Sequence, residues 1–300
     1  MTKIKKDLIK GNLFYSTRRR EPFGPKKIVI LSKFLDMANS SWSKNSKPRG
    51  ANAAGTLNRN ASAAGRDFVP HMKAPRTEFP LFNGKRVTPS LAGLDKLLHY
   101  YGVELQESTL KQIWEFHQLL RANNDDQDLT RLNAFETMVE RHYADCTLIN
   151  AYVPKWPARM IDVGSGAGFP GIPLKLVNPS IRLTLCEPRP NRINFLNMVI
   201  EKMGLKGIDV FGHKVTSRSM TIPVDGVISR AFELMEKTLP RIANSLKVGG
   251  RVYFMKGPAV ADELKTFHPE DFGYKMVAKH FYTIPNSTQD RALVILEREE

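Results

Sequence analysis

The segment at residues 160–171, MIDVGSGAGFPG, constrains the fold of this chain more than any other feature. A short apolar run at 159–163 leads into a loop that contains Gly164, Gly166 and Gly168. Glycine allows a sharp turn and lets a ligand approach the backbone without meeting a Cβ atom. Open α/β sheets bind their ligands at such loops, beyond the carboxyl ends of the strands. The segment therefore predicts a ligand site at the edge of a parallel sheet.

Apolar runs with strand character alternate with helical patterns from this loop to the end of the chain. Strands are expected at 159–163, 181–187, 208–211, 224–229, 251–255, 274–284 and 291–297. Helices are expected between them at 172–177, 191–203 and 237–246. The alternation predicts an α/β fold with a doubly wound, mostly parallel sheet. The closing pair of strands predicts a hairpin with an antiparallel last strand.

Two kinds of ligand fit a glycine-rich loop at a sheet edge. The run at 166–171 matches the GxGxxG pattern of dinucleotide sites, although that match alone is weak. A dinucleotide site needs backbone donors for a pyrophosphate at the helix N-terminus, and Pro170 removes one of them. Asp162 suits a cationic aminoacyl-sulfonium group, and Glu187 at the next strand end is placed to accept from ribose hydroxyls. We favour S-adenosylmethionine over NAD and expect a class I, Rossmann-like methyltransferase fold with a seven-stranded sheet.

Charge and helical periodicity divide the chain into three parts. Residues 1–90 hold 19 Lys/Arg and 5 Asp/Glu, whereas residues 91–300 are nearly balanced at net +1. The first part is expected to be a basic, irregular extension that contacts RNA or the ribosome. Residues 91–150 predict a small helical cap, and residues 151–300 the methyltransferase domain. The expected cap elements are helices at 91–101, 105–120 and 135–149 and a polar loop at 123–133.

Several short motifs occur in the order that one known family shows. Residues 162–174, DVGSGAGFPGIPL, resemble the signature of the GidB (RsmG) family, the bacterial small-subunit ribosomal RNA guanine-N7 methyltransferases. The other similar stretches are DLT at 128–130, VERH at 139–142, DGVISRAF at 225–232, MKG at 255–257 and RALVIL at 291–296. The resemblance covers residues 91–300 and leaves the basic extension without a counterpart. It implies S-adenosylmethionine as the cofactor and small-subunit ribosomal RNA as the substrate.

The loop and the resemblance together imply roles for individual residues. Those expected at the methyl donor are Asp162, Gly164, Gly166, Gly168, Phe169, Glu187, Val215, Thr216 and Arg230. Those expected at the active cleft or the RNA are Arg141, His142, Arg230 and Lys256. Plainer alternatives stay open, because Arg230 can pair with a buried acid and Lys256 can point into solvent. His142 and Phe169 can equally belong to the apolar core, and Arg141 can be an ordinary surface cation.

Two positions depart from the family pattern. Asp128 stands where the family has Asn, and Thr216 stands where it usually has an acid near the adenine. The first changes the charge near the substrate, and the second removes an acceptor for the adenine amino group. Both leave open an alternative function, a ribosome-bound assembly factor or structural component of the same fold with little or no activity.

The expected reaction needs no general base. N7 of guanine carries an exposed lone pair at neutral pH, so the protein has to align this atom with the methyl group. SRA at 229–231 stands where amino-methylating enzymes carry [ND]PP[YF], and neither Cys146 nor Cys186 has the setting of a C5-pyrimidine nucleophile. Arg230 and Lys256 can hold guanine O6 or phosphates.

Partners and compartment follow from charge and from the few cysteines. The expected partner is small-subunit ribosomal RNA or the ribosomal particle, and the protein is expected to be a monomer outside it. No DNA, membrane or metal partner is expected, because no apolar run is long enough to span a membrane and the two cysteines form no cluster. The acid-poor extension containing Arg and Ser favours the mitochondrial matrix, with a bacterial cytoplasm as the alternative.

Overall fold

The computed structural model describes residues 29–30 and 79–299 of the chain. Most of the expected basic extension, residues 1–28 and 31–78, therefore lies outside the described residues. Within the described part, no helix is both long enough and apolar enough to cross a membrane.

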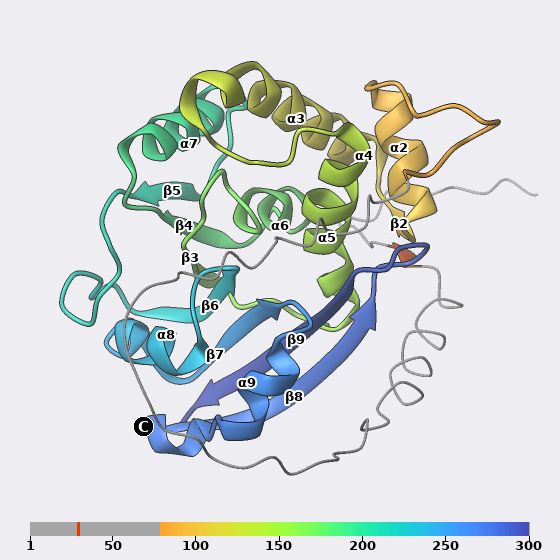
Figure 1. Ribbon diagram of the computed structural model, residues 1–300. Coiled ribbons are helices and arrows are strands. Elements are labelled where there is room, and N and C mark those ends of the chain that lie inside the picture. The colour runs from red at the N-terminus through yellow and green to blue at the C-terminus, as the bar shows by residue number, and fades with distance from the viewer. Residues whose placement is uncertain (1–28, 31–78, 300) are drawn as a thin grey trace, which may run out of the picture.

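One seven-stranded sheet organises the chain, with the strand order β5-β4-β3-β6-β7-β9-β8 (Figure 1). The strands are β3 (Arg159–Val163), β4 (Arg182–Cys186), β5 (Ile208–Phe211), β6 (Val224–Arg230), β7 (Leu246–Lys256), β8 (Tyr274–Thr283) and β9 (Asp290–Arg298). Neighbours from β5 to β7 are parallel, and β9 runs antiparallel to both β7 and β8. The expected doubly wound sheet with an antiparallel last strand is confirmed.

Side chains of each strand alternate between two apolar layers. In β7, Val252 and Phe254 join one cluster, while Tyr253 and Met255 join the other. This period of two follows from the pleat of a strand. Because helices cover both faces, the strands read as nearly continuous apolar runs, and this is why the sequence reveals them.

Helices on the two faces of the sheet complete the layers (Figure 1). One face carries α6 (Gly171–Val177), α7 (Pro190–Lys202) and the cap, and the other carries α8 (Met235–Ile242) and α9 (Val260–Thr266). The helix expected at 237–246 is wrong at both ends, since α8 begins at Met235 and ends at Ile242. It cannot reach residue 246, because Leu246 already pairs with Val224 at the start of β7. Gly249 and Gly250, which in the sequence suggest the end of a helix, lie where the β6–β7 pairing shifts its register.

The cap packs into the same core as α6 and α7. Its elements are α2 (Leu91–Tyr100), β2 (Val103–Glu104), α3 (Glu107–Gln127), α4 (Phe135–Met138), the π-helical turn Val139–Ala144, α5 (Asp145–Leu148) and the 3₁₀ turn Ile149–Ala151. The polar loop expected from residue 123 begins only after Gln127, because buried Asn124 accepts from the Thr130 backbone at 2.8 Å and so closes the helix end.

Three contacts tie residues before position 91 to the cap. Strand β1 (Val29–Ile30) pairs antiparallel with β2. The Arg86 guanidinium donates to both carboxylate oxygens of Glu136, at 2.8 and 2.7 Å. Ser90 caps α2 by accepting from the Gly93 backbone at 3.0 Å. Residues 79–90, which the sequence assigns to the extension, thus contact the helical cap.

Candidate active site

The glycine loop leaves β3 and is fixed to the end of the neighbouring strand. The backbone N–H groups of Gly164 and Ser165 both donate to the Cys186 carbonyl, at 3.0 and 3.2 Å. Gly164, Gly166 and Gly168 all have positive φ, at +78°, +57° and +95°. Residues other than glycine rarely adopt a positive φ, so the backbone of this loop agrees with the glycines in its sequence. At Gly166 the nearest described atom to the place of a Cβ, outside the adjoining residues, is Arg192 Nη1 at 3.7 Å, so this part of the loop is open to a ligand.

Asp162 lies beneath the loop and is fully buried. Its Oδ2 atom accepts from the Gly171 backbone at 3.0 Å, whereas Oδ1 is buried and has no hydrogen-bond partner in the described part of the chain. Burial raises the pKa of this carboxyl group to about 7. A buried acceptor without a partner is unfavourable, and a cationic ligand group nearby would relieve it. Asp162 therefore fits the aminoacyl end of S-adenosylmethionine.

Glu187 follows β4 and orients the loop from its other side. Oε2 accepts from the Gly166 backbone at 3.0 Å, and Oε1 accepts from the Arg189 backbone at 3.0 Å. The Arg192 guanidinium lies 3.7 Å from Oε2. Each carboxylate oxygen can accept more than one hydrogen bond, so Glu187 retains capacity for the ribose hydroxyls of a nucleoside.

Phe169 and His142 pack on each other between the sheet and the cap. Their ring centroids are 4.1 Å apart with an interplanar angle of 11°, and Phe169 also packs against Tyr143. The Arg230 guanidinium lies 5.6 Å from the Phe169 ring centroid. Phe169 is only 5% exposed, so in this structure its ring is part of the packing that supports the loop.

Hydrogen bonds on both ring nitrogens fix the state of His142. Arg230 Nη2 lies 3.0 Å from Nδ1, and since arginine only donates, Nδ1 must accept. The proton is then on Nε2, which donates to Thr130 Oγ1 at 3.1 Å. Burial, with the charge of Arg230, holds the pKa of His142 well below its usual value. His142 is therefore a neutral ring that holds Arg230 in place.

A cluster of buried charges surrounds Arg230 at the end of β6. Arg230 Nη1 donates to the Arg141 carbonyl at 2.7 Å and lies 3.4 Å from Asp145 Oδ2. Arg291 Nε lies 3.3 Å from Asp145 Oδ1, which also accepts from Tyr282 at 3.3 Å. Asp145 follows the VERH motif by three residues, and Arg291 begins the RALVIL motif. The sequence motifs thus lie at or beside both residues, but no pattern in the sequence shows that they meet Arg230.

Arg141, in the π-helical turn, contributes its backbone to the cluster and turns its side chain toward Glu140. Arg141 Nε lies 3.6 Å from Glu140 Oε2 without a hydrogen bond, and the side chain is 31% exposed. The structure therefore joins Arg141 to Arg230 only through the Arg141 carbonyl.

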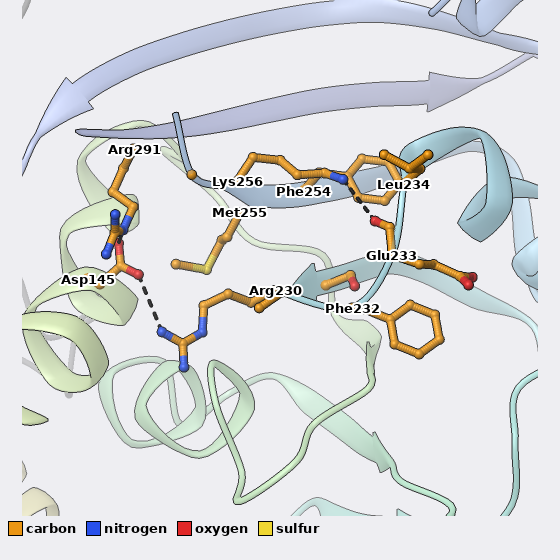
Figure 2. Close-up of a pocket in the computed structure, with 12 residues that line it drawn as sticks. Asp145, Arg230, Phe232, Glu233, Leu234, Phe254, Met255, Lys256 and Arg291 are labelled. Carbon is orange, nitrogen blue, oxygen red and sulfur yellow. Dashed lines mark hydrogen bonds and ion pairs between the residues drawn. The ribbon is translucent and has the colours of Figure 1, made fainter. Parts of the chain in front are cut away.

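A cavity of about 530 Å³ opens beside Arg230, at the carboxyl ends of β6 and β7. Figure 2 shows Arg230, Asp145 and Arg291 at one end and Lys256 at the other. Lys256 Nζ donates to the Glu233 carbonyl at 2.9 Å and forms an ion pair with Glu263 at 3.0 Å. Lys256 lines the cavity and is held by these partners, so it does not extend into solvent.

Phe232 stands between this cavity and the glycine loop. Its ring contacts Gly164 so closely that a Cβ on Gly164 would lie 2.5 Å from it. Ala231 has a φ of +51°, which turns Phe232 away from the direction that Arg230 takes. Phe232 is 37% exposed and lines the cavity. The sequence motif DGVISRAF contains this residue without indicating its position.

The remaining expected donor residues lie after β5, and the two departures have clear local settings. Val215 is buried in the cluster around α8, and Thr216 Oγ1 donates to Ser219 Oγ at 3.0 Å in a turn. Asp128 ends α3 with a φ of +47°, a left-handed conformation that Asp and Asn both tolerate. The change from Asn at this position therefore leaves the helix cap intact.

Comparisons with known proteins match most of the described chain. The family model of GidB, rRNA small subunit methyltransferase G, matches residues 109–293. Ribosomal RNA small subunit methyltransferase G 2 of Syntrophobacter fumaroxidans is 36% identical over 221 residues, 72% of this chain but only 43% of that protein. Ribosomal RNA small subunit methyltransferase G of Yersinia pseudotuberculosis is 34% identical over 69% of this chain and 98% of that protein. Precorrin-6y C5,15-methyltransferase of Geobacter metallireducens, a solved structure, aligns with a TM-score of 0.41 and 12% identity over 60% of this chain and 98% of that chain.

Proposed function

Because this chain belongs to the GidB family of S-adenosylmethionine-dependent methyltransferases, we propose that it methylates N7 of a guanine in small-subunit ribosomal RNA. One observation carries the proposal. The cavity is lined by Arg230, Lys256 and Arg291, and the two described acids that line it, Asp145 and Glu233, are each paired with an arginine. A site of this kind positions an acceptor but has no free group to remove a proton.

Guanine N7 matches such a site because its lone pair is available without deprotonation. The donor, when bound, supplies an electrophilic methyl group on sulfur. The protein then has to hold N7 in line with that methyl group, which is a positioning task. Arg230 is suited to guanine O6 or a phosphate, because its guanidinium is fixed by Asp145 and His142. Lys256, at the opposite end of the cavity, is suited to a phosphate.

Acceptors that need a base or a nucleophile fit less well. His142 is neutral, but its accepting nitrogen is already occupied by Arg230. Burial raises the pKa of Cys146 to about 12 and that of Cys186 well above its usual value, so neither thiol is an active nucleophile. Methylation of an exocyclic amine or of pyrimidine C5 is therefore disfavoured.

Transfer of a labelled methyl group tests the proposal directly. Purified full-length protein is incubated with methyl-tritiated S-adenosylmethionine and small ribosomal subunits that lack N7-methylguanine, and the RNA is digested to nucleosides for mass spectrometry. The expected product is N7-methylguanosine, lost in Arg230→Met and kept in Arg182→Gln, which removes an exposed cation at the amino-terminal end of β4, opposite to the strand ends that form the site. Donor binding by calorimetry without any RNA methylation, or a methyl group on another atom, would overturn the proposal.

The basic residues before position 79 are proposed as a second RNA-binding segment. The support is compositional, since residues 1–90 carry 19 cations against 5 acids. In the full chain, replacing Arg18, Arg19 and Arg20 by Gln should flatten the salt dependence of RNA binding. The log–log slope should fall by about 0.7 for each phosphate of a single strand that these side chains neutralise in the wild type. An unchanged slope would exclude this role.

The same composition supports the mitochondrial matrix as the compartment, ahead of a bacterial cytoplasm. Acid-poor segments containing Arg and Ser are typical of organelle addresses. Fractionation of cells that express the full chain with a C-terminal tag is expected to recover it with matrix markers, and recovery only in the cytosolic fraction would exclude this location.

A further inference from the structure

A second cavity, of about 400 Å³, lies in the cap and shares no lining residue with the first. Four of its residues form one stripe along α3, and the others come from the segment before α2, from the loop after α3 and from the start of α4. The lining residues are Pro89, Trp114, His117, Gln118, Arg121, Asn133 and Phe135. The proposed transfer reaction uses none of them.

Flat aromatic rings form the walls of this cavity. Trp114 and His117 stack with centroids 5.2 Å apart and an interplanar angle of 23°, and Phe135 meets Trp114 edge-on at 6.1 Å. His117 Nδ1 is bonded to the Tyr143 hydroxyl at 3.0 Å, and its Nε2 has no hydrogen-bond partner among the described residues. Burial lowers the pKa of His117 to about 4, so the ring is neutral at physiological pH. The walls therefore offer stacking surfaces and one free polar atom.

The rim of the cavity is polar and carries a cation. Arg121 Nη1 donates to Asn133 Oδ1 at 3.5 Å, and no described carboxylate forms an ion pair with Arg121. Gln118 and Asn133 are exposed beside it. An aromatic wall, amide groups and an uncompensated guanidinium are the groups that recognise a nucleobase and its phosphate on a single strand.

A chain of hydrogen bonds connects this rim to the active site. His142 bonds to Thr130 at 3.1 Å, and the Thr130 backbone donates to Asn124 at 2.8 Å. Asn124 in turn donates to Asn133 at 3.4 Å, which is the residue that Arg121 contacts. The loop of residues 129–133 is therefore hydrogen-bonded both to His142 at the active site and to the rim of the cap cavity.

We propose that the cap cavity binds one nucleotide of single-stranded RNA near the target guanine, with its base on Trp114 and its phosphate at Arg121. This inference rests on the proposed function, because it assigns the cavity to the same RNA. The position beside the loop of residues 129–133, and a cation that no described carboxylate pairs with, favour RNA over a peptide. Substrate selection would then read a flanking nucleotide as well as the guanine itself.

Binding of a fluorescein-labelled single-stranded RNA of about 15 nucleotides to the full chain tests the inference, since such lengths match single-strand site sizes. Trp114→Leu should weaken binding about tenfold without changing its salt dependence, as expected when one base no longer stacks on an aromatic ring. Arg121→Gln should lower the log–log salt slope by about 0.7. Arg182→Gln, the matched removal of one exposed cation at the amino-terminal end of β4, should leave the slope unchanged. Trp114→Phe should restore binding if stacking is the cause.

Two further measurements separate the possible failures. Calorimetry with S-adenosylmethionine should give wild-type affinity for Trp114→Leu and Arg121→Gln, which shows that both variants are folded. The same RNA containing 5-iodouridine should cross-link to a peptide that contains Trp114. If the wild type methylates ribosomal RNA but both variants bind RNA as the wild type does, or the cross-link lies elsewhere, the inference is overturned and the proposed function stands. If the wild type transfers no methyl group to RNA, the proposed function fails first.

Discussion

Replacing Asp145 by Asn is the most informative single change, because one buried carboxylate pairs with two partly buried guanidinium groups. Asp145 is 3% exposed in its side chain, Arg230 16% and Arg291 15%. Asparagine keeps the size but removes the charge and replaces one of the two acceptor oxygens by an NH2 donor. Removing one partner of a buried ion pair destabilises a protein by about 3–5 kcal/mol, because the remaining charges are left uncompensated. The midpoint of thermal unfolding should then fall by about 6–20 °C for a unit of this size.

The surface of the same protein supplies the matched control. Glu297 also faces two cations, Arg251 at 3.0 Å and Lys275 at 3.0 Å, but these are 45% and 49% exposed. Solvent screens such pairs, so Glu297→Gln should lower the free energy of unfolding by no more than about 1 kcal/mol. Urea unfolding followed by fluorescence measures both variants. Calorimetry with S-adenosylmethionine and methyl transfer to ribosomal subunits complete the comparison.

The expected pattern separates the role of Asp145 in stability from its role in positioning Arg230. At a temperature where Asp145→Asn is still folded, donor affinity should be retained while KM for the RNA rises, because Arg230 has no ionic anchor in this variant. A loss of stability within about 1 kcal/mol of that in Glu297→Gln, as exposed pairs give, would refute the reasoning that the cluster is a buried ion network. An unchanged KM would refute the positioning role alone.

Three further outcomes follow from the site. Gly171→Ala should lower the free energy of unfolding by about 1–3 kcal/mol and weaken donor binding, because its Cβ would lie 2.4 Å from Leu185 and 2.6 Å from Asp162 Oδ2. Urea unfolding measures the stability and calorimetry the donor affinity. Unchanged values of both would contradict the prediction. Burial raises the pKa of Asp162 from 3.8 to about 7 in the folded state, so at pH 5 the folded protein keeps a proton that the unfolded chain has released. The free energy of unfolding should therefore fall as the pH rises from 5 to 8. Asp162→Asn should remove that dependence in urea titrations, and an equal slope in both proteins would contradict the assignment. Lys256→Met should raise KM for RNA with donor affinity unchanged, and Lys256→Arg should recover part of it; a donor-binding defect instead would place Lys256 at the cofactor.

The features that the sequence predicts well depend on local backbone rules. The glycine loop is recognisable because positive φ at Gly164, Gly166 and Gly168 admits few other residues. The sheet is recognisable because strands covered on both faces are apolar throughout. These rules act within a few residues, so they apply without knowledge of the tertiary structure.

Long-range partners are not predictable in the same way. Arg230 meets Asp145, 85 positions earlier, because the cap folds onto the sheet, and no local pattern encodes that docking. Arg230 pairs with a buried acid, which is one of the alternatives that the sequence leaves open, but the sequence does not identify Asp145 as that acid. The end of α3 differs from its predicted position for a related reason, since Asn124 is a polar residue that the returning loop buries.

The hydrogen bonds of His142 account for two properties of the site at once. Because Nδ1 accepts from Arg230 and Nε2 donates to Thr130, a protonated ring would turn an N–H at Nδ1 toward a cationic donor and lose that bond. The neutral state is thus required for Arg230 to keep its orientation, and this excludes His142 from taking a proton during transfer while Arg230 is in place. The same bond to Thr130 holds the loop of residues 129–133, which reaches the rim of the cap cavity at Asn133. A ring that cannot act as a base is consistent with an acceptor atom that needs none. The same ring makes the geometry of the loop of residues 129–133 depend on the residue that holds Arg230.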